Sequence, residues 1–220
     1  MFIALIFAMT GYSCKEKGRK YIDQGEIHFN VDYTGIIGVP KELLPQNLVV
    51  SFKNDKILWE MIGIGNSGII NLANPDKGIF DTYYSFFTRK YFYTAQPGEL
   101  FPGFEAMNGM IIKKTLRKEV ICGFNCKNAE VTFSNNKEKV HNIWYTDEIK
   151  IKDPNASTPF YQIDGVLLSF FFFLGPTELH FNAESVYKKD IPDEAFERKD
   201  KFARISKEEI NKFINRMINL

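Results

Sequence analysis

The chain has 220 residues, and its 28 basic and 27 acidic side chains leave a formal net charge of +1 at pH 7. A balance this close to neutral produces no overall field that would draw the protein to nucleic acid or to acidic substrates, so we expect no nucleic-acid partner. Hydrophobic residues make up 45% of the chain, with 21 Phe and 10 Tyr, and this content excludes disorder.

The amino-terminal segment differs from the rest because residues 1–13 carry no charge. An apolar run from Phe2 to Met9 is followed by small or polar residues and then by Cys14, which is the order of a secretory hydrophobic region and its processing site. The run is too short to span a bilayer, which needs about 20 apolar residues. We therefore predict a signal peptide over 1–13, and a hydrophilic tether over 14–24.

A cysteine directly after a small residue resembles the signal of bacterial lipoproteins. In that class the cysteine becomes thioether-linked to diacylglycerol and is the first residue of the mature chain, so the resemblance implies that Cys14 is the lipidation site. Several acyl chains on one cysteine suffice for stable anchoring in a lipid bilayer, whereas a single chain binds marginally. The alternative is a soluble protein whose first strand begins at Met1 and whose Cys14 is an ordinary thiol.

From residue 25 onward, apolar side chains recur mostly with period two, which predicts strands. In 25–33, four apolar side chains alternate with polar ones, as in a strand with one buried face. The pattern continues as consecutive hairpins, and residues 53–56 have the composition of a hairpin turn. The predicted strands are 25–33, 48–52, 57–61, 68–72, 79–84, 90–94, 110–118, 120–133, 140–151, 166–174 and 179–183.

The predicted strand 166–174 is apolar on both parities, so both faces of the sheet need cover there. Near the end, Ser206 and Glu209 form a capping box, and apolar residues follow at helical spacing, which predicts an amphipathic helix over 207–219. We predict one domain over 25–220. Its fold class is mainly β (α+β), a curved antiparallel sheet or incomplete β-barrel that packs on the carboxy-terminal helix.

The two later cysteines, Cys122 and Cys126, are four residues apart. Along one extended strand their Cα atoms would lie about 13 Å apart. A disulfide tolerates roughly 7 Å, so the bond requires a turn at Gly123 or Asn125. An oxidising envelope favours the disulfide, whereas their apolar parity favours buried free thiols, and both alternatives stay open.

Patterns for catalysis and metal binding are weak. The three histidines, His28, His141 and His180, lie far apart, and none has ligand spacing to a cysteine. The adjacent carboxylates of Asp147 and Glu148 would point to opposite faces of a strand. A hydrolase would need His28 or His180 within hydrogen-bond reach of a hydroxyl or carboxylate in a cleft. We therefore predict no catalytic residue, no metal and no cofactor, and hence no enzyme.

The excess of aromatic side chains is the one feature that favours a particular function. A strongly curved sheet around a helix would line an apolar cavity with such groups. The alternative is a bulky two-layer core without a cavity. The predicted ligand-lining residues are Trp59, Phe86, Phe87, Phe170 and Phe172.

Four stretches together resemble a family of Bacteroidetes-type envelope lipoproteins, and the resemblance covers most of 25–190. They are Leu-Pro-Gln-Asn at 44–47, Val-Ile-Cys-Gly-Phe-Asn-Cys-Lys-Asn-Ala at 120–129, Trp-Tyr-Thr-Asp-Glu-Ile at 144–149, and Ile-Asp-Gly-Val-Leu-Leu at 163–168. The fold of this family is similar to that of the lipoprotein carriers LolA and LolB, an incomplete antiparallel barrel around helices. The resemblance implies a lipid or acyl-chain ligand and transfers no catalytic residue.

These observations lead to one hypothesis and one alternative. The hypothesis is a non-enzymatic lipoprotein, held on the periplasmic side of the outer membrane through acylated Cys14, that binds a lipid or other hydrophobic ligand in the curved sheet. The alternative is a structural or interaction lipoprotein with a closed core and no ligand, which docks an envelope partner.

Overall fold

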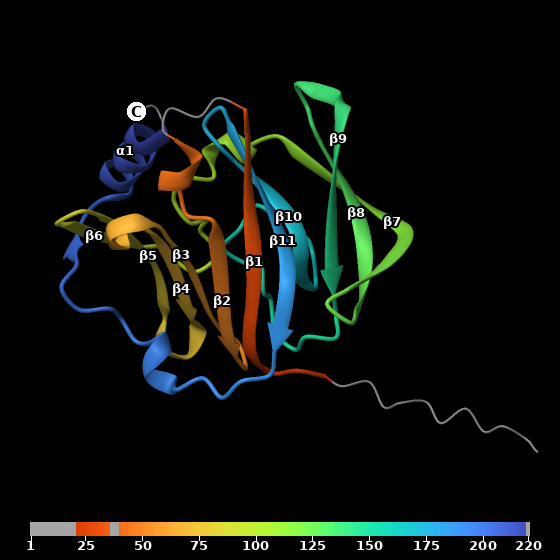
Figure 1. The fold of residues 1–220 in the computed structure, drawn as a ribbon, viewed down its shortest axis with the longest axis horizontal. Coiled ribbons are helices and arrows are strands. Elements are labelled where there is room, and N and C mark those ends of the chain that lie inside the picture. Colours follow the sequence, from red (N-terminus) through yellow and green to blue (C-terminus); the bar gives the residue numbers. More distant parts are fainter. Residues whose placement is uncertain (1–20, 36–39, 219–220) are drawn as a thin grey trace, which may run out of the picture.

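The structure is a computed structural model that describes residues 21–35 and 40–218. The predicted signal peptide, Cys14 and most of the predicted tether lie outside the described residues. Every named strand belongs to one sheet with the order β12-β6-β5-β4-β3-β2-β1-β11-β10-β9-β8-β7 (Figure 1). The strands are β1 Gln24–Gly35, β2 Asn47–Lys53, β3 Lys56–Ile62, β4 Gly68–Asn74, β5 Ile79–Phe86, β6 Arg89–Thr94, β7 Met110–Ile121, β8 Phe124–Phe133, β9 Asn136–Thr146, β10 Val166–Leu174, β11 Thr177–Tyr187 and β12 Ala203–Arg204.

This sheet confirms the predicted fold class. It is mainly antiparallel, it does not close into a barrel, and one α-helix, α1 (Lys207–Ile218), lies at one end of it (Figure 1). Only β12 runs parallel to its neighbour, β6, over a two-residue contact. Short 3-10 helices occupy several connections, at Lys41–Leu43, Ile64–Asn66, Pro75–Lys77, Glu105–Met107 and Asp193–Phe196.

The predicted strand 120–133 is wrong in one respect, because a hairpin turn divides it. Cys122 and Gly123 form the turn between β7 and β8, with φ angles of 52° and 83°. Two successive positive φ angles are the geometry of the tight turn that matches the right-handed twist of the strands. The predicted strand 140–151 is also shifted, since β9 begins at Asn136 and ends at Thr146.

β1 lies in the middle of the sheet and joins its two halves. On one side it pairs with β2, and on the other it pairs with β11, with Phe29 opposite both Leu48 and Ala183 (Figure 1). The strands β2 to β6 then follow in chain order on one side, and β11 to β7 follow in reverse order on the other. The amino-terminal strand is therefore held by ladders on both edges.

The sheet between β2 and β5 has two covered faces. The face that carries Val50, Trp59, Asn71 and Thr82, which pair in one row across the four strands, is here called the inner face. Loops 95–109 and 151–165 lie on the inner face. The opposite, outer face is covered by the segment 188–202, whose buried side chains form a small apolar cluster with those of β3, β4 and β5. This cluster is Leu58, Leu72, Ile79, Tyr83, Ile191 and Phe196.

β10 is covered on both faces, as its two-sided apolar pattern predicts. Phe170 and Phe172 contact each other with ring centroids 5.3 Å apart, and both contact Trp59 of β3. On the other parity, Phe171 stacks on His141 of β9 with centroids 4.3 Å apart. Burial of both faces explains why alternation is lost in this strand.

The predicted helix is confirmed over the described residues, and so is its capping box. The Ser206 backbone N–H donates to Glu209 Oε2 at 2.9 Å, and the Glu209 N–H donates to Ser206 Oγ at 3.3 Å. The apolar side of α1 packs on β5 and β6, where Phe213 stacks on Tyr84 and Tyr91. The helix therefore covers the β5–β6 end of the sheet, whereas β10 is covered by other parts of the chain, among them Phe104 and Phe160 of the two inner-face loops.

Candidate ligand-binding site

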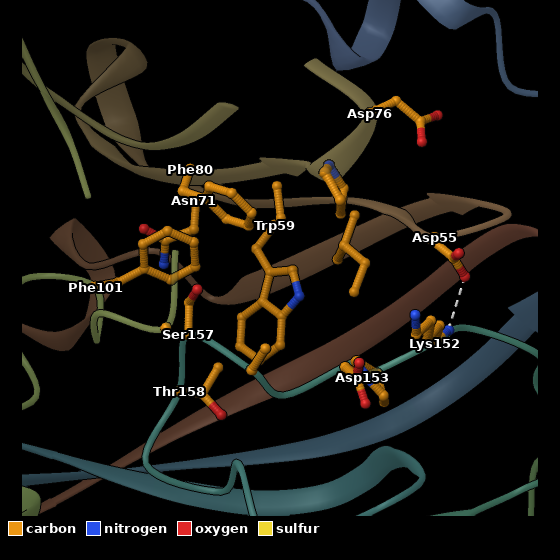
Figure 2. Close-up of a pocket in the computed structure, with 16 residues that line it drawn as sticks. Asp55, Trp59, Asn71, Asp76, Phe80, Phe101, Lys152, Asp153, Ser157 and Thr158 are labelled. Atoms are coloured by element: carbon orange, nitrogen blue, oxygen red, sulfur yellow. Dashed lines mark hydrogen bonds between the residues drawn. The ribbon is translucent and has the colours of Figure 1, made fainter. Parts of the chain in front are cut away.

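A hollow of about 370 Å³ opens between β3, β4, β5 and loop 151–165. Trp59 of β3 is half-buried at its centre, and Phe80 and Phe101 add two further aromatic side chains to its wall (Figure 2). Small-molecule sites commonly enclose about 300–1,000 Å³. We call this space the Trp59 hollow, and its volume is that of a site for a small ligand.

Hydrogen bonds fix the shape of loop 151–165 and join it to a neighbouring loop. The buried amide of Asn155 donates to the carbonyl oxygens of Ile163 and Gly165, at 2.8 and 2.9 Å. The Phe101 backbone N–H donates to the Ser157 carbonyl at 3.0 Å, which ties this loop to loop 95–109. These bonds position the loop side chains before any ligand arrives, which lowers the entropic cost of binding.

Amide and hydroxyl groups gather at one end of the hollow. Asn71 is the cross-strand partner of Trp59, and the Thr82 hydroxyl donates to its Oδ1 at 2.8 Å. Ser157 is only 5% exposed and lines the same space. Figure 2 shows Asn71, Ser157 and Phe101 together on one side of the Trp59 ring.

Carboxylates gather at the other end. Asp55, in the β2–β3 turn, accepts the Lys152 backbone N–H at 2.9 Å, and Asp76 and Asp153 stand at the rim (Figure 2). All three aspartates are exposed. Lys152 is the single basic residue among the described residues that line the hollow, so negative charge prevails at its rim.

A second, apolar pocket lies on the other side of Trp59, but it holds only about 70 Å³. Phe104 fills much of the space above β10, with its ring centroid 4.5 Å from that of Phe172. Phe160 lies over the same strand, 5.7 Å from Phe172. An acyl chain therefore does not fit into this pocket without rearrangement, and the larger accessible volume is the Trp59 hollow.

The structure brings together three of the five residues that we predicted as ligand-lining. Trp59 lines both cavities, Phe172 lines the apolar pocket, and Phe170 is 2% exposed beneath Trp59. Phe86 instead belongs to the cluster around α1, and Phe87 is 73% exposed in the β5–β6 turn. Phe170, Phe86 and Phe87 line neither cavity.

Both later cysteines are free thiols in the structure, so the disulfide alternative is not formed here. The turn that a bond requires is present at Gly123, but the Cys122 thiol contacts the Ala183 carbonyl at 3.3 Å, and the Cys126 thiol contacts the Phe124 carbonyl at 3.5 Å. Burial raises the pKa of Cys126 to about 11 and also raises the pKa of Cys122. Thiols of this kind are poor nucleophiles at neutral pH.

All three histidines meet a carboxylate, but none does so in either cavity. His28 Nε2 lies 3.3 Å from Glu26 Oε2, whereas His180 Nε2 and His141 Nδ1 each lie 2.9 Å from Glu178 Oε1. None of these five residues lines the Trp59 hollow or the apolar pocket. In the described part of the chain, no three His, Cys, Asp or Glu side chains are arranged to hold a metal ion.

Within residues 21–35 and 40–218, no helix has the length and apolar character needed to cross a membrane. No protein-family model and no curated protein sequence matches the chain. Among solved structures, PNGF-II matches with a TM-score of 0.52 and 15% identity, over 86% of this chain. The chain spans about a third of the length of PNGF-II, 33%, and at this identity the likeness concerns the fold alone.

Two further solved structures are a lipoprotein and a LolA superfamily protein, the classes that the sequence resembles. The first is the Mycobacterium tuberculosis lipoprotein LppX, which is 12% identical and matches over 77% of this chain and 89% of its own length. The second is the LolA superfamily protein NE2245 from Nitrosomonas europaea, which is 12% identical and matches over 80% of this chain and 90% of its own length. Both have a TM-score of 0.34. Lipoprotein-type and LolA superfamily structures are thus among the neighbours of this chain, but scores this low add no argument about the ligand.

Proposed function

We propose that this chain is a non-enzymatic envelope lipoprotein, anchored through acylated Cys14 on the periplasmic side of the outer membrane, that binds a small ligand with an apolar face in the Trp59 hollow. The observation that carries the binding proposal is the half-buried Trp59 at the centre of a space of about 370 Å³. An exposed aromatic surface in a preformed concavity is the usual anchor for the apolar part of a ligand.

The cavities favour a ligand that has polar groups over the purely hydrophobic ligand that the sequence suggests. The mainly apolar pocket, which Asn71 also lines, holds only about 70 Å³, whereas the larger hollow combines three aromatic side chains with amide, hydroxyl and carboxylate groups. A pure hydrocarbon would bury these polar groups without partners, which costs free energy. The ligand that suits the hollow is therefore amphipathic.

Ligand binding is testable through Trp59 itself, because the chain has only two tryptophans. In the Trp144→Phe variant, Trp59 is the sole indole fluorophore. We expect the neutral fluorescent probe phenyl-naphthylamine to quench its emission saturably, by energy transfer from Trp59 to the bound probe. The further substitution Phe101→Ala should weaken this binding because it removes part of the aromatic wall, whereas Phe87→Ala should leave it unchanged. Linear, non-saturable quenching would contradict a binding site.

The membrane anchor is testable by replacing Cys14 with alanine. Without the Cys14 thiol no thioether to diacylglycerol can form, so incorporation of labelled palmitate into the immunoprecipitated protein should be lost. Cys122→Ala is the matched control and should retain the label, since that thiol lies in the β7–β8 turn. Labelling of the Cys14→Ala protein at the wild-type level would contradict the anchor.

One observation favours the alternative of an interaction lipoprotein. β7 is an edge strand of the sheet, and Leu116 and Val120 on it are 98% and 65% exposed. Exposed edge strands with apolar side chains are templates for pairing with another chain. If the Trp144→Phe protein binds no small-molecule probe, this edge becomes the surface to examine.

A further inference from the structure

The Trp59 hollow contains three hydrogen-bond donors without a partner among the described residues. They are the Trp59 indole N–H, the Asn71 amide nitrogen and the Ser157 hydroxyl. The Thr82 hydroxyl donates to Asn71 Oδ1, so the Asn71 NH₂ is the end of that amide left for a ligand. Ser157 is 5% exposed, and Figure 2 shows its oxygen directed toward the hollow. A hydroxyl on a side chain as buried as Ser157 normally has a hydrogen-bond partner, and the half-buried Trp59 and Asn71 present their donors to the same space, where a ligand or water can accept from them.

Acceptors at the rim complement these donors. Asp76 and Asp153 have no ion-pair or hydrogen-bond partner for their carboxylates in the described part of the chain, and Asp55 has one oxygen left after it accepts the Lys152 N–H. Three carboxylates against one lysine would repel a phosphate, a sulfate or a carboxylate at short range. The charge of the rim therefore disfavours anionic ligands.

The donors, the carboxylates and the aromatic faces together discriminate between the remaining ligand classes. A simple organic cation would satisfy the carboxylates and the aromatic faces, but it would leave the donors of Asn71 and Ser157 unmatched. An alkyl chain would match the aromatic faces alone and would leave the three donors without a partner, which lowers affinity. A ring that carries several hydroxyl groups matches all three features, because every hydroxyl both donates and accepts and the C–H face of the ring lies flat on an aromatic side chain.

We propose that the ligand of the Trp59 hollow is a saccharide unit that is neutral or carries an amino group. Its C–H face lies on the ring of Trp59, its hydroxyls accept from Asn71 and Ser157 at one end, and its hydroxyl or ammonium groups donate to Asp55 and Asp153 at the other. A volume of about 370 Å³ suits a ligand of one or two sugar rings. This inference rests on the proposed function that the hollow binds a ligand.

The test is a glycan array probed with the purified protein, followed by calorimetric titration of the best binders. The array holds neutral, amino-bearing, sulfated, phosphorylated and sialylated saccharides, and free nucleosides and tetramethylammonium are titrated alongside. We expect binding of neutral or amino-bearing saccharides only. Ser157→Ala and Asp153→Asn should each lower the affinity about tenfold, which corresponds to the loss of one hydrogen bond of about 1.4 kcal/mol.

Two controls make the outcome decisive. Phe87→Ala changes an exposed aromatic side chain outside the hollow and should leave the affinity unchanged. Trp59→Leu, which keeps an apolar side chain at the centre of the hollow, should abolish saccharide binding while the circular dichroism spectrum stays that of the wild type. Binding that survives Trp59→Leu, or a preference for acidic glycans, nucleosides or tetramethylammonium, overturns the inference.

The result also separates this inference from the proposed function. If phenyl-naphthylamine quenches Trp59 saturably but no saccharide binds, the hollow is a binding site and the saccharide inference is wrong. If neither the probe nor any saccharide binds, both the proposed ligand binding in the Trp59 hollow and the saccharide inference are wrong.

Discussion

Replacing Phe170 with alanine is expected to lower the free energy of unfolding by about 4 kcal/mol, in line with other buried Phe-to-Ala substitutions. The side chain is 2% exposed and lies where the two halves of the sheet meet. Its ring centroid is 5.4 Å from that of Phe29, 5.6 Å from that of Trp59 and 4.8 Å from that of Phe181. These neighbours belong to three different strands, so the cavity left by the ring cannot collapse by movement of one element.

Urea denaturation followed by far-ultraviolet circular dichroism measures this effect. Phe87→Ala removes a phenyl ring that is 73% exposed and should change the free energy of unfolding by less than about 0.5 kcal/mol. Phe170→Leu, which keeps most of the volume, should cost less than Phe170→Ala. A Phe170→Ala protein that unfolds at the wild-type urea midpoint would show that the aromatic cluster is not the centre of the core.

Replacing Arg198 with methionine is expected to lower the free energy of unfolding by about 3 kcal/mol, because it leaves a buried charge without its partner. The Asp81 carboxylate is completely buried and accepts from Arg198 Nε at 2.8 Å and from the Tyr83 hydroxyl at 2.8 Å. The hydrogen bond to Asp81 raises the pKa of Arg198. The Arg198–Asp81 pair thus joins segment 188–202 to β5 on the outer face of the sheet.

The effect of Arg198→Met can be distinguished from the loss of any surface ion pair. Lys212→Met removes an exposed pair with Glu208 and should change stability by no more than about 0.5 kcal/mol. The double variant Arg198→Met with Asp81→Asn carries no buried charge and should recover part of the lost stability. If Arg198→Met and Lys212→Met give the same urea midpoint, the buried Asp81 does not depend on Arg198.

Most of the strands could be predicted from the sequence because their two faces differ in solvent exposure. In β1, Ile27, Phe29, Val31 and Tyr33 face the core and the residues between them are more exposed, so burial itself creates the alternation. The β7–β8 turn was not predicted. Cys122 adopts a positive φ that sequence patterns associate with Asn, Asp or Gly, and no such residue precedes Gly123.

The site was predictable only in part. Trp59 and Phe172 were predicted from the excess of aromatic side chains on the strands, and both line a cavity. The two-sided apolar pattern of β10 could not show which of its faces Phe172 occupies. Ser157 and Asp153 lie on loop 151–165, whose place beside β3 depends on the bond from the Lys152 N–H to Asp55 and on the bond from the Phe101 N–H to the Ser157 carbonyl. Such long-range contacts leave no periodic signal, so polar residues of the loop carried no indication of their role.

The central position of β1 has a consequence for how the chain reaches its folded state. The ladder between β1 and β11 joins residues near the start of the sheet to residues near the end of the chain, such as Phe29 and Ala183. Folding rates fall as contacts become less local in sequence, because a long loop must close before they form. The sheet therefore cannot be completed until β11 has been synthesised, although the local hairpins from β2 to β6 need no residue of that strand.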